Sequence, residues 1–376
     1  MRSISTDAAQ ELLAAYGAIA SSKYQKVAGD KPLIGLVGVG VPREVIHGFA
    51  ATPVQLAGLE ETRTGVAEFM EEFTPWHWQG IGEGMLRGNY RDFAAVVLDR
   101  SHQHFYYYLK EMQRHAAGRA FPPVLLLDWI QAADKDHSIY QEAQVASFTS
   151  SLERITGRTY APALAQMAAR EYNEMRVTLR AFQASRSKST LSGSEAYKLM
   201  AASHAMSPAR YRKLLAAVMD CESATRTSSA SPRILLVSSH SMISLKLHEA
   251  VEAAGCRVVA ESDWWGTRCA HDDVPLTGDI SDMCTFYACL GIGEFVAPMA
   301  KRIEWYHNLA NFKGVDFAVL HHSSNDEYAG WDYPFIIQAL ARMGIVGVAV
   351  EGDIETAAGR QRVTVAVGQQ AQRVVR

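Results

Sequence analysis

Cysteine is scarce in this sequence: five cysteines occur among 376 residues, all of them in the second half of the chain. Their number is odd, and no Cys-x-x-Cys pair occurs. This pattern argues against a disulfide scaffold and against a structural zinc site with the usual ligand spacing. A free cysteine is commonly a small buried apolar side chain, and we interpret these thiols in that way.

Long apolar runs and an excess of one charge are also missing. No run of 18 apolar residues occurs, so no membrane span is expected. The first twenty residues carry acidic side chains and no apolar core with a cleavage site, which argues against a signal or transit peptide. The formal net charge of −3 argues against nucleic-acid or anionic-membrane binding by bulk electrostatics. We expect a cytoplasmic protein with no nucleic-acid and no membrane partner.

Short runs rich in Val, Ile and Leu alternate with helix-like segments. They lie at 33–41, 94–98 and 123–127, and again at 234–237, 257–260, 317–320 and 346–350. Strand, turn and helix repeated in this way indicate parallel sheets covered by helices. Between them, residues 138–220 show helical spacing of apolar side chains and no strand-like run. The sequence therefore predicts an α/β protein with two Rossmann/flavodoxin-like parallel-sheet domains joined by a helical segment.

The predicted organisation has three parts. Residues 1–137 comprise an N-terminal helix and the first α/β domain, residues 138–231 form the helical connector, and residues 232–376 form the second α/β domain. The Ser/Thr-rich stretch 225–231, which precedes a proline, is a predicted loop at the second boundary.

Polar residues gather where the predicted strands end, which is where open parallel sheets bind ligands. The segments are Gly38–Glu44 (GVGVPRE), Asp99–His104 (DRSHQH) and His321–Glu327 (HHSSNDE). The Gly-x-Gly spacing is weak evidence for phosphate binding, and a plain tight turn is the favoured interpretation. His77, in an aromatic stretch, is a further candidate. Two histidines and a carboxylate suffice for a mononuclear metal, whereas the simpler interpretation is solvated or hydrogen-bonded loop residues.

Four stretches, in order along the chain, resemble the 2-hydroxyacyl-CoA dehydratase and benzoyl-CoA reductase family. Residues 41–58 (VPREVIHGFAATPVQLAG) resemble its opening Pro-x-Glu motif, and residues 153–179 resemble its helical connector with Thr-Gly and Tyr-Asn-x-x-Arg. Residues 233–268 resemble the start of its second domain, and residues 301–353 its closing strands and Asp-Tyr-Pro helix.

The resemblance implies two-domain α/β subunits that pair as heterodimers. In such enzymes each subunit typically holds a [4Fe–4S] cluster through three cysteines in strand-end loops. A separate ATP-dependent activator supplies a low-potential electron for anaerobic metabolism. The implied reaction is radical dehydration of a 2-hydroxyacyl-CoA, or reduction of an aromatic thioester.

The sequence departs from the family pattern at the implied cluster ligands. These positions fall near Trp76–Trp78, at His102 and near Asp326, and none carries a cysteine. A conventional cluster needs thiolate ligands, so we expect this chain to hold no [4Fe–4S] cluster at the usual place.

Three hypotheses follow. The chain is a cluster-free subunit that pairs with a homologous, cysteine-bearing subunit as a heterodimer or heterotetramer and helps to enclose an acyl-CoA. Alternatively, it is an enzyme with a repurposed mononuclear metal site made of His77, His102 and Asp326. The third hypothesis is a non-catalytic binding or scaffolding protein, in which His102 and Asp326 only make hydrogen bonds.

Individual roles are assigned on the same basis. Glu44, His102 and Asp326 are the candidate catalytic residues, with a helix N-terminal charge as the simpler role of Glu44. Arg43 and Arg268 are the candidates for the pyrophosphate of an acyl-CoA, or else ordinary surface residues.

Overall fold

The structure is a computed structural model that describes residues 6–20, 31–59, 63–71, 74–115, 121–130, 138–223, 231–239, 241–290, 298–324 and 326–374. The chain forms two compact units. The N-terminal unit consists of Gly17–Glu174 and Asp272–Ala297. The C-terminal unit consists of Met1–Tyr16, Met175–His271 and Pro298–Arg376. Each unit therefore combines segments that are far apart in the sequence.

The N-terminal unit contains a four-stranded parallel sheet in the order β2-β1-β3-β4. Its strands are β1 (Leu33–Val37), β2 (Thr52–Gln55), β3 (Phe93–Asp99) and β4 (Val124–Leu127). Three of them confirm the predicted runs, although β1 ends four residues earlier than expected. Strand β2 was not predicted, because its four residues include Pro53 and give no apolar alternation. A proline is tolerated there because β2 is an edge strand.

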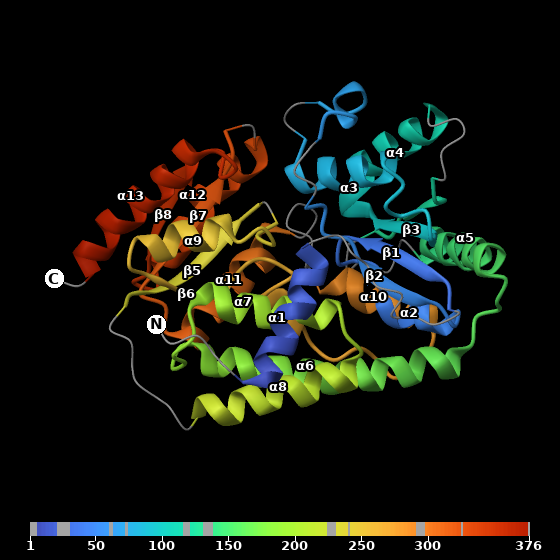
Figure 1. The fold of residues 1–376 in the computed structure, drawn as a ribbon, viewed down its shortest axis with the longest axis horizontal. Helices are drawn as coiled ribbons and strands as arrows, with labels where there is room; N and C mark the ends of the chain where they lie inside the picture. Colours follow the sequence, from blue (N-terminus) through green and yellow to red (C-terminus); the bar gives the residue numbers. More distant parts are fainter. Residues whose placement is uncertain are drawn as a thin grey trace. The chain divides into compact units, whose positions relative to one another are not determined.

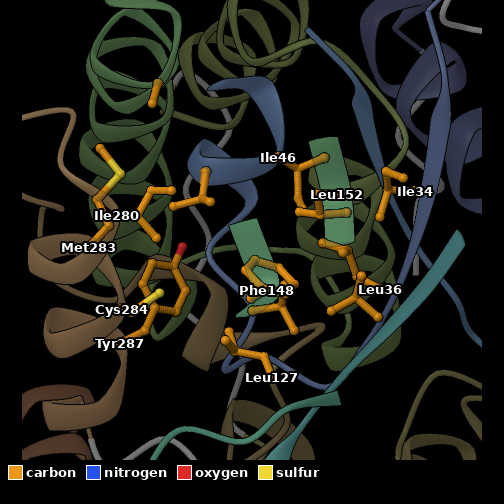
Figure 2. Packing of buried hydrophobic residues seen from close by; sticks show 14 of the residues in the cluster. Ile34, Leu36, Ile46, Leu127, Phe148, Leu152, Ile280, Met283, Cys284 and Tyr287 are labelled. Carbon is orange, nitrogen blue, oxygen red and sulfur yellow. The ribbon is translucent and has the colours of Figure 1, made fainter. Parts of the chain in front are cut away.

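Helices flank this sheet. They are α2 (Arg43–Gly48), α3 (Trp76–Leu86), α4 (Gln103–His115), α5 (Ser138–Thr156) and, much later in the chain, α10 (Ile280–Cys289). Figure 1 shows α10, in orange, among the blue elements of this unit. Its side chains Ile280, Met283 and Cys284 join one hydrophobic cluster with Ile34 and Phe148 (Figure 2). Burial of these apolar surfaces therefore ties a late segment to the first sheet.

The C-terminal unit repeats the same plan. Its sheet has the order β6-β5-β7-β8, and all neighbouring strands are parallel. The strands are β5 (Arg233–Ser238), β6 (Arg257–Glu261), β7 (Phe317–His322) and β8 (Val346–Glu351). Its helices include α7 (Gly193–Ala201), α8 (Pro208–Ser223), α9 (Lys246–Ala253), α11 (Met299–Lys313), α12 (Glu327–Ala341) and α13 (Ala357–Val374). The predicted class, two parallel-sheet α/β domains, is confirmed.

The predicted helical connector is helical in its described residues, as α5, α6 (Pro162–Arg186), α7 and α8. One division between the compact units lies within α6, between Glu174 and Met175, and the three-part organisation stays a prediction. Residues 225–230 of the predicted boundary loop lie outside the described residues. Helix α1 (Asp7–Ala20) covers the described part of the predicted N-terminal helix.

Both sheets share one topological feature. The second strand along the chain pairs on one side of the first strand, and the third strand pairs on the other side. The chain therefore leaves β1 and β3, and likewise β5 and β7, in opposite directions at the carboxyl edge. Such switch points are the usual ligand sites of open parallel sheets. We name the β1/β3 edge the first switch point and the β5/β7 edge the second switch point.

Candidate functional site

The first switch point brings together the loop after β1 and the turn after β3. Val37 pairs with Leu98 at the ends of these strands, so Gly38 and Asp99 follow as neighbours. Gly38 has a φ of +89°, a backbone conformation that favours glycine and turns the chain out of the strand. The two polar segments predicted at this edge therefore meet in the structure.

Asp99 is the centre of this arrangement. Its Oδ2 accepts a hydrogen bond from the Gly40 backbone N–H at 2.7 Å. Its Oδ1 accepts from the Ser101 N–H at 2.9 Å and lies 2.9 Å from His102 Nδ1. Burial favours a higher pKa for Asp99, but His102 and these donors outweigh it and hold the pKa below its ordinary value. Asp99 is therefore an ionised carboxylate that accepts hydrogen bonds from two loops.

The glycines at 38 and 40 are explained by this carboxylate. A Cβ on Gly38 would lie 2.2 Å from Asp99 Oδ2 and 2.6 Å from the His102 ring, and one on Gly40 would lie 2.9 Å from Asp99 Cβ. The Gly40 N–H that a bound phosphate would need is already donated to Asp99. The Gly-x-Gly spacing therefore serves a tight turn packed against an aspartate–histidine pair.

An aromatic surface covers the other side of His102. The Trp78 indole lies with its ring centroid 5.5 Å from that of His102 and stacks on Phe105 at 5.3 Å. Trp78 belongs to the first turn of α3, and its buried Nε1 has no hydrogen-bond partner among the described residues. His77 lies beside the rings of Trp76 and Trp78, at 5.9 and 6.1 Å.

Glu44 occupies a separate, buried position in the same unit. It lies in the first turn of α2, is fully buried, and accepts a hydrogen bond from the Tyr287 hydroxyl at 2.9 Å. One turn later, burial lowers the pKa of His47 to about 4, with Glu44 opposing the shift and Arg43 reinforcing it. The Arg43 guanidinium lies over the Tyr172 ring at 5.3 Å.

The predicted residues of the C-terminal unit have structural contacts. Asp326 is the N-cap of α12, and its Oδ1 accepts from the Ala329 N–H at 3.0 Å. Arg268 is 5% exposed, donates from Nε to the Ser262 carbonyl, and lies over the Trp305 ring at 4.0 Å. A pyrophosphate contact by Arg268 stays a prediction.

The second switch point is also occupied by a histidine. His321 is fully buried; its Nδ1 lies 3.2 Å from Ser238 Oγ, and its Nε2 lies 2.9 Å from the Gly352 carbonyl oxygen. A carbonyl oxygen only accepts, so Nε2 carries the proton and the Ser238 hydroxyl donates to Nδ1. This histidine ties the ends of three neighbouring chain segments together.

The described residues give no support to a metal centre. No cluster of three or more His, Cys, Asp or Glu side chains is arranged there to hold a metal ion. The proposed ligand set draws His77 and His102 from the N-terminal unit and Asp326 from the C-terminal unit, and it stays a prediction. In the described part of the chain, no helix has the length and apolarity to cross a bilayer.

Three residues of these sites, Asp99, Trp78 and Tyr287, received no individual role from the sequence, although Asp99 and Trp78 lie in segments that were predicted as parts of a site. Asp99 stands at the start of the DRSHQH segment, and its position as the last residue of a strand was the available signal. Trp78 was named only because one implied cluster-ligand position falls near Trp76–Trp78, where His77 was the candidate ligand. Nothing local marks Tyr287, because its partner Glu44 is 243 residues away.

Comparison with known proteins gives one family. The family model described as 2-hydroxyglutaryl-CoA dehydratase, D-component, matches residues 38–374, which is nearly the whole chain. A search of curated proteins finds no match.

Proposed function

The chain belongs to the 2-hydroxyglutaryl-CoA dehydratase D-component family, and on this premise we propose that it is a cluster-free subunit of a heteromeric acyl-CoA enzyme. Its partner is a homologous subunit that carries the cluster cysteines, in a heterodimer or heterotetramer. The substrate is an acyl-CoA thioester, and the reaction is that of a 2-hydroxyacyl-CoA dehydratase or a related reductase.

One observation carries this proposal: the expected ligand position at the first switch point is filled by an internally bonded pair. His102 stands where the family resemblance implies a thiolate, and it is held by Asp99 at 2.9 Å against Gly38. The position near Trp76–Trp78 offers indole groups, and Asp326 caps a helix. Imidazole, indole and one carboxylate do not fit a conventional [4Fe–4S] cluster, which requires thiolates.

The environments of the two buried cysteines are consistent with this proposal. Burial raises the pKa of Cys284 strongly, since its thiol lies in the hydrophobic cluster of Figure 2. Burial also raises the pKa of Cys256 to about 11. Both thiols are buried away from the first switch point's His102 and Trp78, in sites that apolar neighbours fill, and we interpret them as core side chains.

The electron for the reaction then has to enter through the partner. We propose that an ATP-dependent activator acts on the cysteine-bearing subunit, while this chain helps to bind the acyl-CoA. Arg43, beside the carboxyl end of β1, is the better placed of the two candidate pyrophosphate ligands, because Arg268 is buried and engaged. Glu44 is the further candidate for proton transfer, through the carboxylate bonded to Tyr287.

Anaerobic co-expression tests the proposal. The chain is produced alone and with a tagged cysteine-bearing homologue, and native mass, iron, sulfide and other metals are measured in each preparation. We expect a stable complex in which iron and sulfide depend on the partner's cysteines. A strictly homomeric chain, or iron–sulfur absorbance from this chain alone, would contradict the proposal. A stoichiometric metal that disappears in His102→Ala would instead support the mononuclear metal hypothesis.

A further inference from the structure

The sheet of the C-terminal unit has an open edge at β8. Strand β6, at the other edge, is buried along its whole length, whereas β8 exposes Val346, Ala349 and Glu351. Among the described residues, no strand pairs with the outer side of β8. Figure 1 shows β8 with α12 and α13 beside it. The edge therefore presents backbone donors and acceptors together with apolar side chains.

The sequence of β8 lacks the features that usually protect an edge strand. Natural edge strands carry a proline, a lysine or a bulge that prevents pairing with another chain. In the sheet of the N-terminal unit, the edge strand β2 contains Pro53. Strand β8 has the sequence VGVAVE, with neither proline nor lysine, and pairs with β7 in an unbroken register over its six residues. It is therefore a regular strand on which a further strand can pair.

The backbone of β8 determines which of its residues would pair. Gly352 N–H donates to the His322 carbonyl oxygen of β7 at 3.0 Å. The N–H and C=O groups of a strand point to its two sides alternately, so every second residue of β8 faces β7 and the residues between face the open edge. The outward-facing residues are Gly347, Ala349 and Glu351. Antiparallel pairing centred on Ala349 would place it opposite its own equivalent, and Gly347 opposite Glu351.

The charges at the two ends of β8 favour such a pairing. Gly347 faces α12, and Glu351 lies four residues later on the strand, hence on the same face. Arg342, four residues before β8, ends α12 and is exposed. Arg362 belongs to α13, on the other face near Gly352. On the α12 face, antiparallel strands therefore bring the acidic end of each to the basic end of the other, whereas parallel strands would bring like charges together.

The flank of α12 next to β8 is suited to a close neighbour. Ile337 lies on this flank, because a Cβ on Gly347 would be 2.8 Å from its Cγ1. Gly330, Pro334 and Ala341 recur at helical spacing from that position, so they lie on the same side of the helix, and all three are exposed. A continuous sheet would bring two helices α12 side by side, and such small side chains allow their axes to approach closely.

We propose that β8 pairs antiparallel with the β8 of a second copy of this chain, so that two C-terminal units share one continuous eight-stranded sheet. The contact is isologous: the same edge serves both copies across a two-fold axis. The inference goes beyond the proposed function, because it concerns two copies of this chain and not the cysteine-bearing partner. Together with the proposed function, it selects the heterotetramer over the heterodimer.

Sedimentation equilibrium over a concentration series tests the inference, on the full chain alone and on its co-purified complex. The wild-type chain alone is expected to form a dimer. Ala349→Pro removes an N–H that faces away from β7, so the ladder within the chain is kept. Two symmetry-related hydrogen bonds of the dimer are lost, so its dissociation constant should rise about hundredfold. Circular dichroism verifies that the variant is folded.

Charge reversal provides a second set of variants that leaves the backbone of β8 unchanged. Arg342→Glu and Glu351→Arg should each raise the dissociation constant about fivefold, because two symmetry-related contacts become repulsive. The double variant should restore the wild-type value. A general loss of structure cannot be rescued in this way, so the restoration reports the antiparallel pairing itself.

Trp331→Ala is the matched control. Trp331 is 78% exposed and belongs to the same helix, but it lies six residues before Ile337 and therefore on a different side of α12. This variant removes a larger exposed apolar surface than any of the others. It is expected to leave the dissociation constant unchanged.

Three outcomes overturn the inference. A wild-type chain that is monomeric at every concentration does so, and so does a dimer that Ala349→Pro leaves intact or that only Trp331→Ala dissociates. If the chain alone is monomeric and Ala349→Pro releases the cysteine-bearing subunit from the complex, the edge binds that subunit, and the inference is wrong while the proposed function stands. A β8-dependent dimer that binds no such subunit supports the inference and contradicts the proposed function.

Discussion

The two switch points have the same strand topology, but their histidines differ in the number of ring nitrogens that make hydrogen bonds. Each carries histidine at or just after the end of the third strand of its sheet: His102 follows β3, and β7 ends in His321 and His322. Both ring nitrogens of His321 are engaged, by Ser238 and by the Gly352 carbonyl, and the side chain is fully buried. His102 is held through Nδ1 alone within the described residues. The same fold position therefore holds a histidine with both ring nitrogens bonded in one unit and, among the described residues, a histidine bonded through Nδ1 alone in the other.

The two units also differ in the pKa of a buried aspartate, Asp99 in the N-terminal unit and Asp263 in the C-terminal unit. Asp99 is paired with His102, and its pKa lies below the ordinary value. Asp263 follows β6 and accepts from the backbone N–H groups of Met242 and Trp265 and from the Tyr197 hydroxyl. Burial raises the pKa of Asp263 to about 6, with Glu261 adding to the shift against these donors. A buried carboxylate whose hydrogen bonds come only from backbone N–H groups and a tyrosine hydroxyl thus remains harder to ionise than one that also lies against a histidine ring.

The largest expected effect comes from Gly38→Ala, which breaks the first switch point. The new methyl group would meet Asp99 Oδ2 at 2.2 Å, at a φ of +89°. Strain and displacement of the Asp99–His102 pair should lower the free energy of unfolding by about 4 kcal/mol. Urea unfolding monitored by tryptophan fluorescence measures the loss.

Gly88→Ala is the matched control for this substitution. Gly88 also has a positive φ, +74°, in the same unit, but its new methyl group would have no heavy atom within 4 Å apart from its chain neighbours. Only backbone strain remains, so the expected loss is about 1 kcal/mol. Equal losses for the two variants would show that Asp99 and His102 do not pack on Gly38.

A smaller effect should appear in the pH dependence of stability at Asp263. Its folded pKa of about 6 exceeds the ordinary value near 4, so between pH 4 and pH 6 the folded state binds more protons than the unfolded state. Stability should fall by about 2–3 kcal/mol as the pH rises through this window, and Asp263→Asn should remove that slope. Urea titrations at half-unit pH steps test this.

Asp99 provides the opposite sign as a control. Its folded pKa is depressed, so its contribution is present above the ordinary carboxyl pKa and is lost as the pH falls below about 4. Asp99→Asn should leave the slope between pH 4 and pH 6 unchanged. If both aspartate variants altered that slope equally, the contrast between the two units would be wrong.

Much of the fold was predictable from the sequence, whereas the partners within the sites were not. Every strand of the two described sheets except β2 is an apolar run that a parallel sheet would bury, and these runs were predicted. The short edge strand β2 was missed because Pro53 and its brevity remove the signal. Segment 99–104 was predicted as a site from its position after a strand. The Asp99–Gly40 bond depends on strand order, which local residue patterns do not encode.

The smallest expected change in the free energy of unfolding concerns the hydroxyl of Ser238 at the second switch point. Ser238→Ala removes the hydroxyl that donates to His321 Nδ1 at 3.2 Å inside a buried network, so the free energy of unfolding should fall by about 1.5 kcal/mol. Ser239→Ala, at the next position, removes a buried hydroxyl that has no partner among the described residues. Its loss should stay within about 0.5 kcal/mol of wild type.

Urea unfolding of the two serine variants compares the hydroxyl that contacts His321 with a hydroxyl that has no hydrogen-bond partner among the described residues. If Ser238→Ala costs no more than Ser239→Ala, then the Ser238 hydroxyl does not stabilise the His321 ring. The contrast between the two switch points would then depend on the contact between His321 Nε2 and the Gly352 carbonyl oxygen.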